Sequence, residues 1–256
     1  MSLEFSDTTN NDGLVQHFEI EVGGIDGLAA FSGNTTKLKV VTALINQALD
    51  DFWNIAIPAS GKWQLDDSNQ TDYPIVSTNL IASQRDYSFT VDASSNLILD
   101  IYRVFVLTSA TGTQYREIYP VDAQSDIETW GLTDGQNLEG PPYRYDKTAN
   151  GIFLDPIPSY SATNGLKLYI NREASYFTTA STTKKPGVPG VLHKYFYLKA
   201  ASEYARMNTL SVYPGLEREV IKYEGVNGSG GIIREHFGYR ARDERKRLTM
   251  AKNNFW

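Results

Sequence analysis

The spacing of apolar residues changes twice along this chain, and this change limits the folds that it can adopt. Between residues 38 and 53, apolar side chains recur every three or four positions, which is typical of an amphipathic helix. From about residue 61 to 177, short runs alternate apolar and polar residues, as in Tyr87–Val91, and indicate β-strands. The helical spacing returns after Pro189. The chain is therefore predicted to be an α+β protein.

Capping and turn residues predict where the elements begin and end. Asp12 is a candidate cap for a first helix that stops at Gly23–Gly24. The segment Asn34-Thr35-Thr36 is expected to cap a second helix, which Pro58 is expected to end. In the β region, Asn150–Gly151 separates two apolar runs and tolerates the positive φ angles of a tight hairpin turn.

Two helical stretches precede the β region and two follow it, and neither pair alone makes a sizeable core. We therefore expect one helical bundle formed by the N- and C-terminal segments, with an inserted antiparallel β domain and an extended C-terminal arm. The expected bounds are 1–58 and 186–227 for the two halves of the bundle, 59–185 for the β domain, and 228–256 for a Gly-rich linker with the arm.

Charge is distributed unevenly between the arm and the rest of the chain. Residues 234–256 hold seven basic and three acidic side chains, which leaves 17 of the 24 basic and 27 of the 30 acidic residues to the rest. Arginine and aromatic residues are common at the energetic centres of interfaces. The sequence therefore predicts an arm, mobile when free, that orders on a partner through Arg234, Phe237, Tyr239, Arg240, Arg242, Arg245, Arg247, Phe255 and Trp256.

Two alternatives for the arm stay open. It could be a solvated tail without a partner, since chain ends are often mobile. Direct DNA binding is less favoured because Asp243 and Glu244 lie inside the basic run. Ile232, Ile233 and Phe237 form an apolar strip that is expected to be too narrow to hold a lone helix in place.

The sequence offers no recognisable catalytic or cofactor-binding pattern. It contains no cysteine, which excludes disulfides, thiolate metal sites and cysteine nucleophiles. His17, His193 and His236 are too far apart for a metal-binding spacing. Phosphate-binding loops and nucleophile elbows are absent as well. We therefore expect no enzymatic activity, no catalytic or metal-ligating residues and no cofactor.

An acidic stretch at residues 66–72 superficially resembles a calcium-binding loop. Counted from Asp67, the sixth position is Asp72 where a glycine is needed, and the twelfth position is not a glutamate. A polar connecting loop is the preferred interpretation. The first residues lack the features of a secretory signal, and no apolar run approaches the roughly 18 residues of a membrane span. The sequence therefore predicts a soluble protein without a membrane partner.

The order of several short motifs resembles one protein family. Gly140-x-Pro142-x-x-Tyr145 is followed by Leu154-Asp155-Pro156-x-Pro158, then by the strand Leu166–Ile170, and finally by Pro189-x-x-x-His193-Lys194. Across residues 10 to 250, this order is similar to that of the head-to-tail connector (adaptor) proteins of tailed bacteriophages.

The resemblance implies a structural role. Such adaptors form a ring, usually a dodecamer, below the portal protein of the virion, after synthesis in the host cytoplasm. Their C-terminal arms dock on the portal, their β domains meet the next tail component, and double-stranded DNA passes through the central channel without specific binding. An acidic body suits a channel that should not hold DNA. The alternatives are a virion-associated cell-wall-degrading enzyme and a carbohydrate-binding module.

Overall fold

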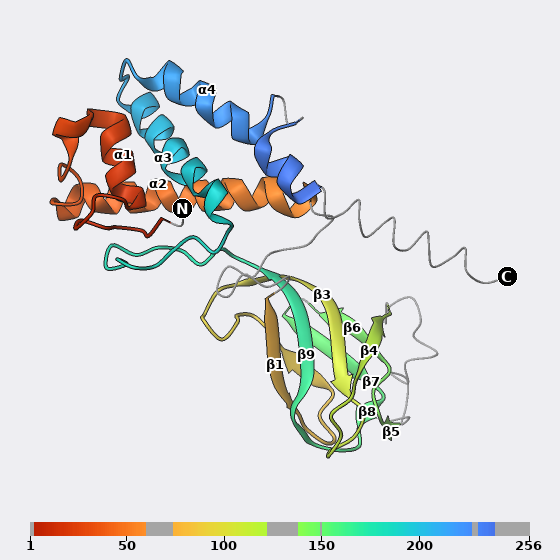
Figure 1. Cartoon of the computed structure of the whole chain (residues 1–256). Helices are drawn as coiled ribbons and strands as arrows, with labels where there is room; N and C mark the ends of the chain where they lie inside the picture. Colours follow the sequence, from red (N-terminus) through yellow and green to blue (C-terminus); the bar gives the residue numbers. More distant parts are fainter. Residues whose placement is uncertain (1–2, 60–73, 122–137, 149, 227–229, 239–256) are drawn as a thin grey trace. The chain divides into compact units, whose positions relative to one another are not determined.

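The chain divides into two compact units (Figure 1). A computed structural model describes residues 3–59, 74–121, 138–148, 150–226 and 230–238. The helical unit combines Met1–Asp72 with Ala174–Trp256, and the β unit is Tyr73–Glu173. The predicted α+β class is confirmed. The inserted unit is shorter than the expected 59–185, because the chain from Ala174 onwards packs into the helical core through Ala174 and Phe177.

The helical unit is organised around α3, which packs against α1, α2 and α4. A further helical stretch covers residues 232–238. The elements are α1 (Leu14–Gly23), η1 (Ile25–Gly27), α2 (Thr35–Ala59), η2 (Gly190–Leu192), α3 (His193–Met207) and α4 (Tyr213–Glu224), where η denotes a 3-10 helix.

The helix caps agree with the sequence at α2 and differ at α1. Asn34 Oδ1 accepts hydrogen bonds from the backbone N–H groups of Thr36 and Lys37, both at 3.1 Å, so the cap falls within the predicted segment, at Asn34. The helix continues through Pro58 to Ala59, one residue beyond its predicted end. The N-cap of α1 is Gly13, which has no side chain to act as a cap. The prediction of Asp12 as the cap is wrong, and its carboxylate lies 2.9 Å from His17 Nε2 instead.

Aromatic side chains dominate the core of the helical unit. Phe52 lies at its centre, with ring centroids of Trp53, Phe196, Phe237 and Tyr195 between 5.2 and 6.1 Å away. Such ring pairs contribute beyond the apolar area that they bury. The other buried aromatic residues of this core are Phe5, Phe18, Phe31, Phe177, Tyr197 and Tyr223.

Both ends of the chain are needed to close this core. Phe5 stacks on Phe177 with ring centroids 4.7 Å apart, and its backbone N–H donates to the carbonyl of Lys184 at 2.7 Å. Residues separated by more than 170 positions therefore share one core.

The β unit is a curled seven-stranded sheet in the order β1-β9-β3-β4-β6-β7-β2, beside a two-stranded sheet of β5 and β8 (Figure 1). The first and last strands, β1 and β9, pair antiparallel, so the two ends of the β unit lie side by side, with Ile75 opposite Tyr169. The strands are β1 (Ile75–Leu80), β2 (Asp86–Ser88), β3 (Ile98–Leu107), β4 (Tyr115–Pro120), β5 (Glu139–Gly140), β6 (Arg144–Thr148), β7 (Gly151–Asp155), β8 (Ile157–Pro158) and β9 (Ala162–Arg172).

The β unit is mixed rather than wholly antiparallel. Strands β4 and β6 pair in parallel, with Tyr119 opposite Arg144. The predicted hairpin is confirmed: β6 and β7 pair antiparallel, and Thr148 lies opposite Gly151. The turn differs from the prediction, because Gly151 is the first residue of β7 and does not have a positive φ angle.

Aliphatic side chains dominate the core of the β unit. They alternate over the middle of its two longest strands, at Val104 and Val106 of β3 and at Leu166, Leu168 and Ile170 of β9. The fully or almost fully buried members include Val104, Val106, Ile118, Ile152, Leu154, Leu166, Leu168 and Ile170, joined by the rings of Tyr87, Phe89 and Tyr145.

Candidate functional site

The residues predicted to contact a partner divide between the helical stretch 232–238 and the tail that follows it. Arg234 and Phe237 lie on the helical stretch. The other predicted contact residues, Tyr239, Arg240, Arg242, Arg245, Arg247, Phe255 and Trp256, lie outside the described residues, as does the acidic stretch at 66–72.

The helical stretch 232–238 belongs to the core of the helical unit. Ile233 is 0% exposed and Phe237 is 8% exposed. The ring of Phe237 packs edge-on against Phe52, with centroids 5.8 Å apart. The apolar strip that was expected to be too narrow to hold a helix is therefore buried, because α2 supplies an aromatic surface for it. This burial corrects the assignment of Phe237 to a partner-binding arm.

Gly231 explains how the chain turns back onto α4. Its φ angle is +90°, and a Cβ atom there would lie 2.6 Å from the carbonyl oxygen of Tyr223 and from the backbone N of Gly225. Only glycine combines this backbone conformation with so close an approach. Part of the Gly-rich segment thus acts as a packed turn, which its composition alone did not indicate.

One side of the helical stretch 232–238 remains exposed. Ile232, Glu235 and His236 lie on this side, and Arg234 is half-buried. The Nε atom of Arg234 is buried and has no hydrogen-bond partner among the described residues. A buried guanidinium donor without an acceptor is costly. Arg234 therefore has unused capacity to bind an acceptor such as a carboxylate or a carbonyl group.

A charged network fastens α2, α3 and α4 together. Lys199 Nζ lies 2.8 Å from Glu224 Oε1 and 3.4 Å from Asp51 Oδ2. The hydroxyl of Tyr195 donates to the same Glu224 oxygen at 2.8 Å. The network joins residues that are far apart in the sequence, which is why no local motif revealed it.

The pKa shifts in this network indicate a structural role. Burial raises the pKa of Asp51, against the attraction of Lys199. Burial disfavours the charge of Lys199, but the hydrogen bond and charge of Glu224 outweigh this effect and raise its pKa. Burial also raises the pKa of Tyr195. Lys199 and Tyr195 thus both keep their protons at neutral pH, which suits ion pairing rather than proton transfer.

The described part of the β unit holds three ion pairs of low exposure, two of them on Asp155. Asp155 accepts from Arg144 Nε at 2.6 Å and from Arg85 at 3.3 Å. Asp92 pairs with Arg172, and both side chains are almost fully buried. Burial alone would raise the pKa of Asp92, but hydrogen bonds from Asn96 and Arg172 outweigh it and lower the pKa. These pairs fix loops and strand ends to the sheet.

The described histidines have structural partners. His193 Nδ1 accepts from the backbone N–H of Leu3 at 2.9 Å, so its Nε2 carries the proton and donates to the carbonyl of Val188 at 2.9 Å. Burial lowers the pKa of His193. His17 stacks on Tyr197. Within the described part of the chain, no three histidine or acidic side chains gather where they could hold a metal ion.

Comparison with known proteins adds no family assignment, since neither a protein-family model nor a curated protein matches the chain. Among the described residues, no helix has the length and apolar character to cross a membrane.

Proposed function

We propose that this chain is a structural head-to-tail connector of a tailed bacteriophage virion. It assembles as a ring, most simply a dodecamer, below the portal protein, and leaves a central channel through which double-stranded DNA passes without specific binding. The segment after Phe237 docks on the portal, and the β unit faces the next tail component.

The observation that carries the proposal is the sequence position of the β unit, which interrupts the helical unit. The helical unit is built from both ends of the chain, and the β unit is inserted between them. The resemblance to connector proteins implies this organisation. Leu154 and Asp155 end β7, Leu166–Ile170 lies in β9, and His193 begins α3.

Charge supports a role in assembly around DNA. The described units contain most of the acidic residues, whereas residues 239–256 have six basic and two acidic side chains. A ring of these acidic units multiplies the negative charge around a channel. The basic tail of each copy, residues 239–256, can then bind an acidic surface of another protein. Many tails that bind one ring gain affinity through avidity.

A non-enzymatic role is the simpler proposal for the buried acids. Asp51, Glu224, Asp92 and Asp155 each contact a lysine or arginine within the fold. A carboxylate that is engaged in this way is poorly placed to attack or protonate a substrate. The purified protein is expected to release no product from peptidoglycan; turnover that disappears on changing one aspartate or glutamate would contradict this proposal.

The portal contact is tested by two truncations. A protein ending at residue 238 keeps Ile233 and Phe237, so we expect it to stay folded and to lose portal binding in native mass spectrometry. A protein ending at residue 231 lacks these core residues and is expected to lose stability as well. Deletion of residues 234–256 would also remove the buried Phe237, so loss of portal binding could not be distinguished from loss of stability.

A pair of variants, one that removes the positive charges and one that keeps them, then separates arginine recognition from net charge. Changing Arg240, Arg242, Arg245 and Arg247 to glutamine is expected to abolish binding to the portal ring, and changing them to lysine is expected to weaken it less. Unchanged portal affinity of the protein that ends at 238 would reject the proposed contact. A stable dimer that forms without portal would contradict assembly on the portal.

A further inference from the structure

A hairpin of the β unit exposes three aliphatic side chains on one face. Val91 and Leu97 are paired across it, and the backbone bonds from Ile98 to Thr90 and from Asp92 to Asn96 set the same register. Val91 and Leu97 are therefore neighbours across the hairpin, and Leu99 follows Leu97 by two residues along the same strand. Val91, Leu97 and Leu99 are 47%, 45% and 58% exposed. A cluster of exposed aliphatic residues is characteristic of an interaction surface.

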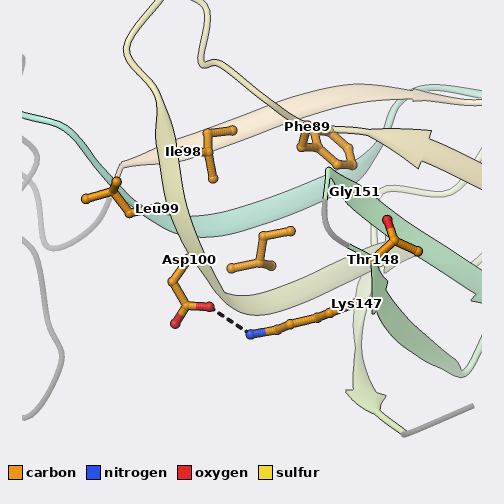
Figure 2. A pocket seen from close by; sticks show the side chains of 8 residues that line it. Phe89, Ile98, Leu99, Asp100, Lys147, Thr148 and Gly151 are labelled. Carbon is orange, nitrogen blue, oxygen red and sulfur yellow. Dashed lines mark hydrogen bonds and ion pairs between the residues drawn. The ribbon is translucent and has the colours of Figure 1, made fainter. Parts of the chain in front are cut away.

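A pocket lies directly beside this face. Its apolar part is formed by Phe89, Ile98, Leu99 and Ile101, and it is completed by Asp100, Lys147, Thr148 and Gly151. Figure 2 shows Phe89 and Ile98 on one side of the pocket and the Asp100–Lys147 pair on the other. The floor is thus hydrophobic and part of the rim is charged.

The volume of the pocket limits what can occupy it. It measures about 100 Å³, whereas pockets for cofactors and drug-sized molecules measure roughly 300–1,000 Å³. A cavity of about 150 Å³ accommodates a group the size of benzene. The pocket therefore has room for one aliphatic side chain and not for a nucleotide or a flavin.

The rim defines the chemistry around that side chain. Asp100 Oδ1 and Lys147 Nζ lie 2.9 Å apart, and both side chains are nearly half exposed. The ammonium group has three donors and the carboxylate has two acceptor oxygens, so one mutual bond leaves capacity on both. The carboxylate can accept a hydrogen bond from a backbone N–H group, and the ammonium group can donate one to a backbone carbonyl group. A peptide presents both of these backbone groups next to each of its side chains.

We propose that the face of Val91, Leu97 and Leu99, with the adjoining pocket, binds an extended segment of a partner protein. One aliphatic side chain of that segment fills the pocket, and its backbone bonds to Asp100 and Lys147. A second copy of the same hairpin face fits less well, because two strand faces placed against each other provide no protruding side chain for either pocket. The inference concerns the β unit and does not depend on portal binding.

The test uses random twelve-residue peptides displayed for selection on the full-length protein, followed by affinity measurement on a synthetic peptide of the selected consensus. We expect the selected peptides to share one leucine, isoleucine or methionine. Changing that residue to alanine should weaken binding at least tenfold. Leu99→Asp in the protein should have an effect of the same size, and Lys147→Gln should have a smaller one.

Ile81→Asp serves as the matched control, because Ile81 is an aliphatic residue of the same unit with similar exposure, outside this face. It should leave peptide affinity within twofold. Peptides without a common apolar residue, or equal binding by the Leu99→Asp variant, would overturn the proposal. Self-association of the full-length protein that disappears in the Leu99→Asp variant would identify a second copy as the occupant and would also overturn it.

Discussion

The two units of the molecule reach stability by different means. The helical unit has an aromatic core whose members come from both ends of the chain, whereas the β unit has an aliphatic core drawn from one continuous segment. The difference implies that the β unit contains all that its fold requires, whereas the helical unit depends on distant segments meeting. Substitutions that act on one unit should therefore leave the other unchanged.

Phe52→Ala is expected to have the largest effect. It removes four ring contacts from the centre of the helical core, and truncation of a buried phenylalanine costs about 3–5 kcal/mol. Urea unfolding monitored by near-ultraviolet circular dichroism should show an earlier transition for the helical unit and an unchanged transition for the β unit. An equal shift of both transitions would show that the units are not independent.

Leu168→Ala provides the mirror experiment in the β unit. Leu168 is fully buried on β9 and lies opposite Val104 of β3, and removal of its side chain should cost about 2–5 kcal/mol. The β transition should occur earlier in urea while the helical transition stays in place. The exposed change Ile75→Ala serves as the control, and it is expected to move neither transition by more than about 0.5 kcal/mol.

Gly231→Ala should destabilise only the helical unit, and by less. The positive φ and the 2.6 Å approach to α4 force either strain or movement of the helical stretch 232–238, at a cost of roughly 1–3 kcal/mol. Hydrogen exchange should show faster exchange at Glu235, whose N–H donates to the carbonyl of Gly231 at 3.0 Å. Gly215→Ala is the matched control, since a Cβ there meets no other atom within 4 Å.

Lowering the pH into mild acid should have the smallest effect on stability, and it should destabilise the helical unit more than the β unit. Burial holds the pKa of His193 below its usual 6.5, so below that pH the unfolded protein binds a proton that the folded helical unit refuses. Stability is therefore lost as the pH falls, by at most about 1.4 kcal/mol per pH unit. The lowered pKa of Asp92 preserves its contribution to the β unit until the pH falls below 3.8.

The pH prediction is checked by unfolding at pH 7.0, 6.0 and 5.0. The helical transition should weaken over this range more than the β transition does. His193→Gln can keep both hydrogen bonds without taking up a proton, and it should flatten the difference. A β transition that is the more sensitive of the two between pH 7 and 5 would reject this explanation.

The sequence predicted those parts of the fold that local signals determine. Asn34 and the apolar stripe that follows it identified α2, and Asn150–Gly151 identified the β6–β7 hairpin. The prediction of Asp12 as a cap was wrong because the type of a residue does not specify where the helix begins, and the N-cap position is occupied by Gly13. Local patterning therefore located most elements but not always their ends.

The parts that depend on distant partners could not be predicted. The helical stretch 232–238 was missed because burial of Phe237 requires Phe52, which lies far away in sequence. Lys199 gave no sign that Asp51 and Glu224 would meet around it. The pocket of the β unit also combines residues from two separated segments, and only the alternation at Val91, Leu97 and Leu99 could have indicated its exposed face.

The insertion of the β unit also sets an order of events during synthesis on the ribosome. The β unit is complete once Glu173 has emerged, but the helical core needs Phe237, about sixty residues later. At 5–20 residues per second, α1 and α2 wait roughly 3–13 s for their last partner after the β unit is complete. During that interval their apolar faces are exposed, so a ribosome-associated chaperone would be most useful to the first helices made.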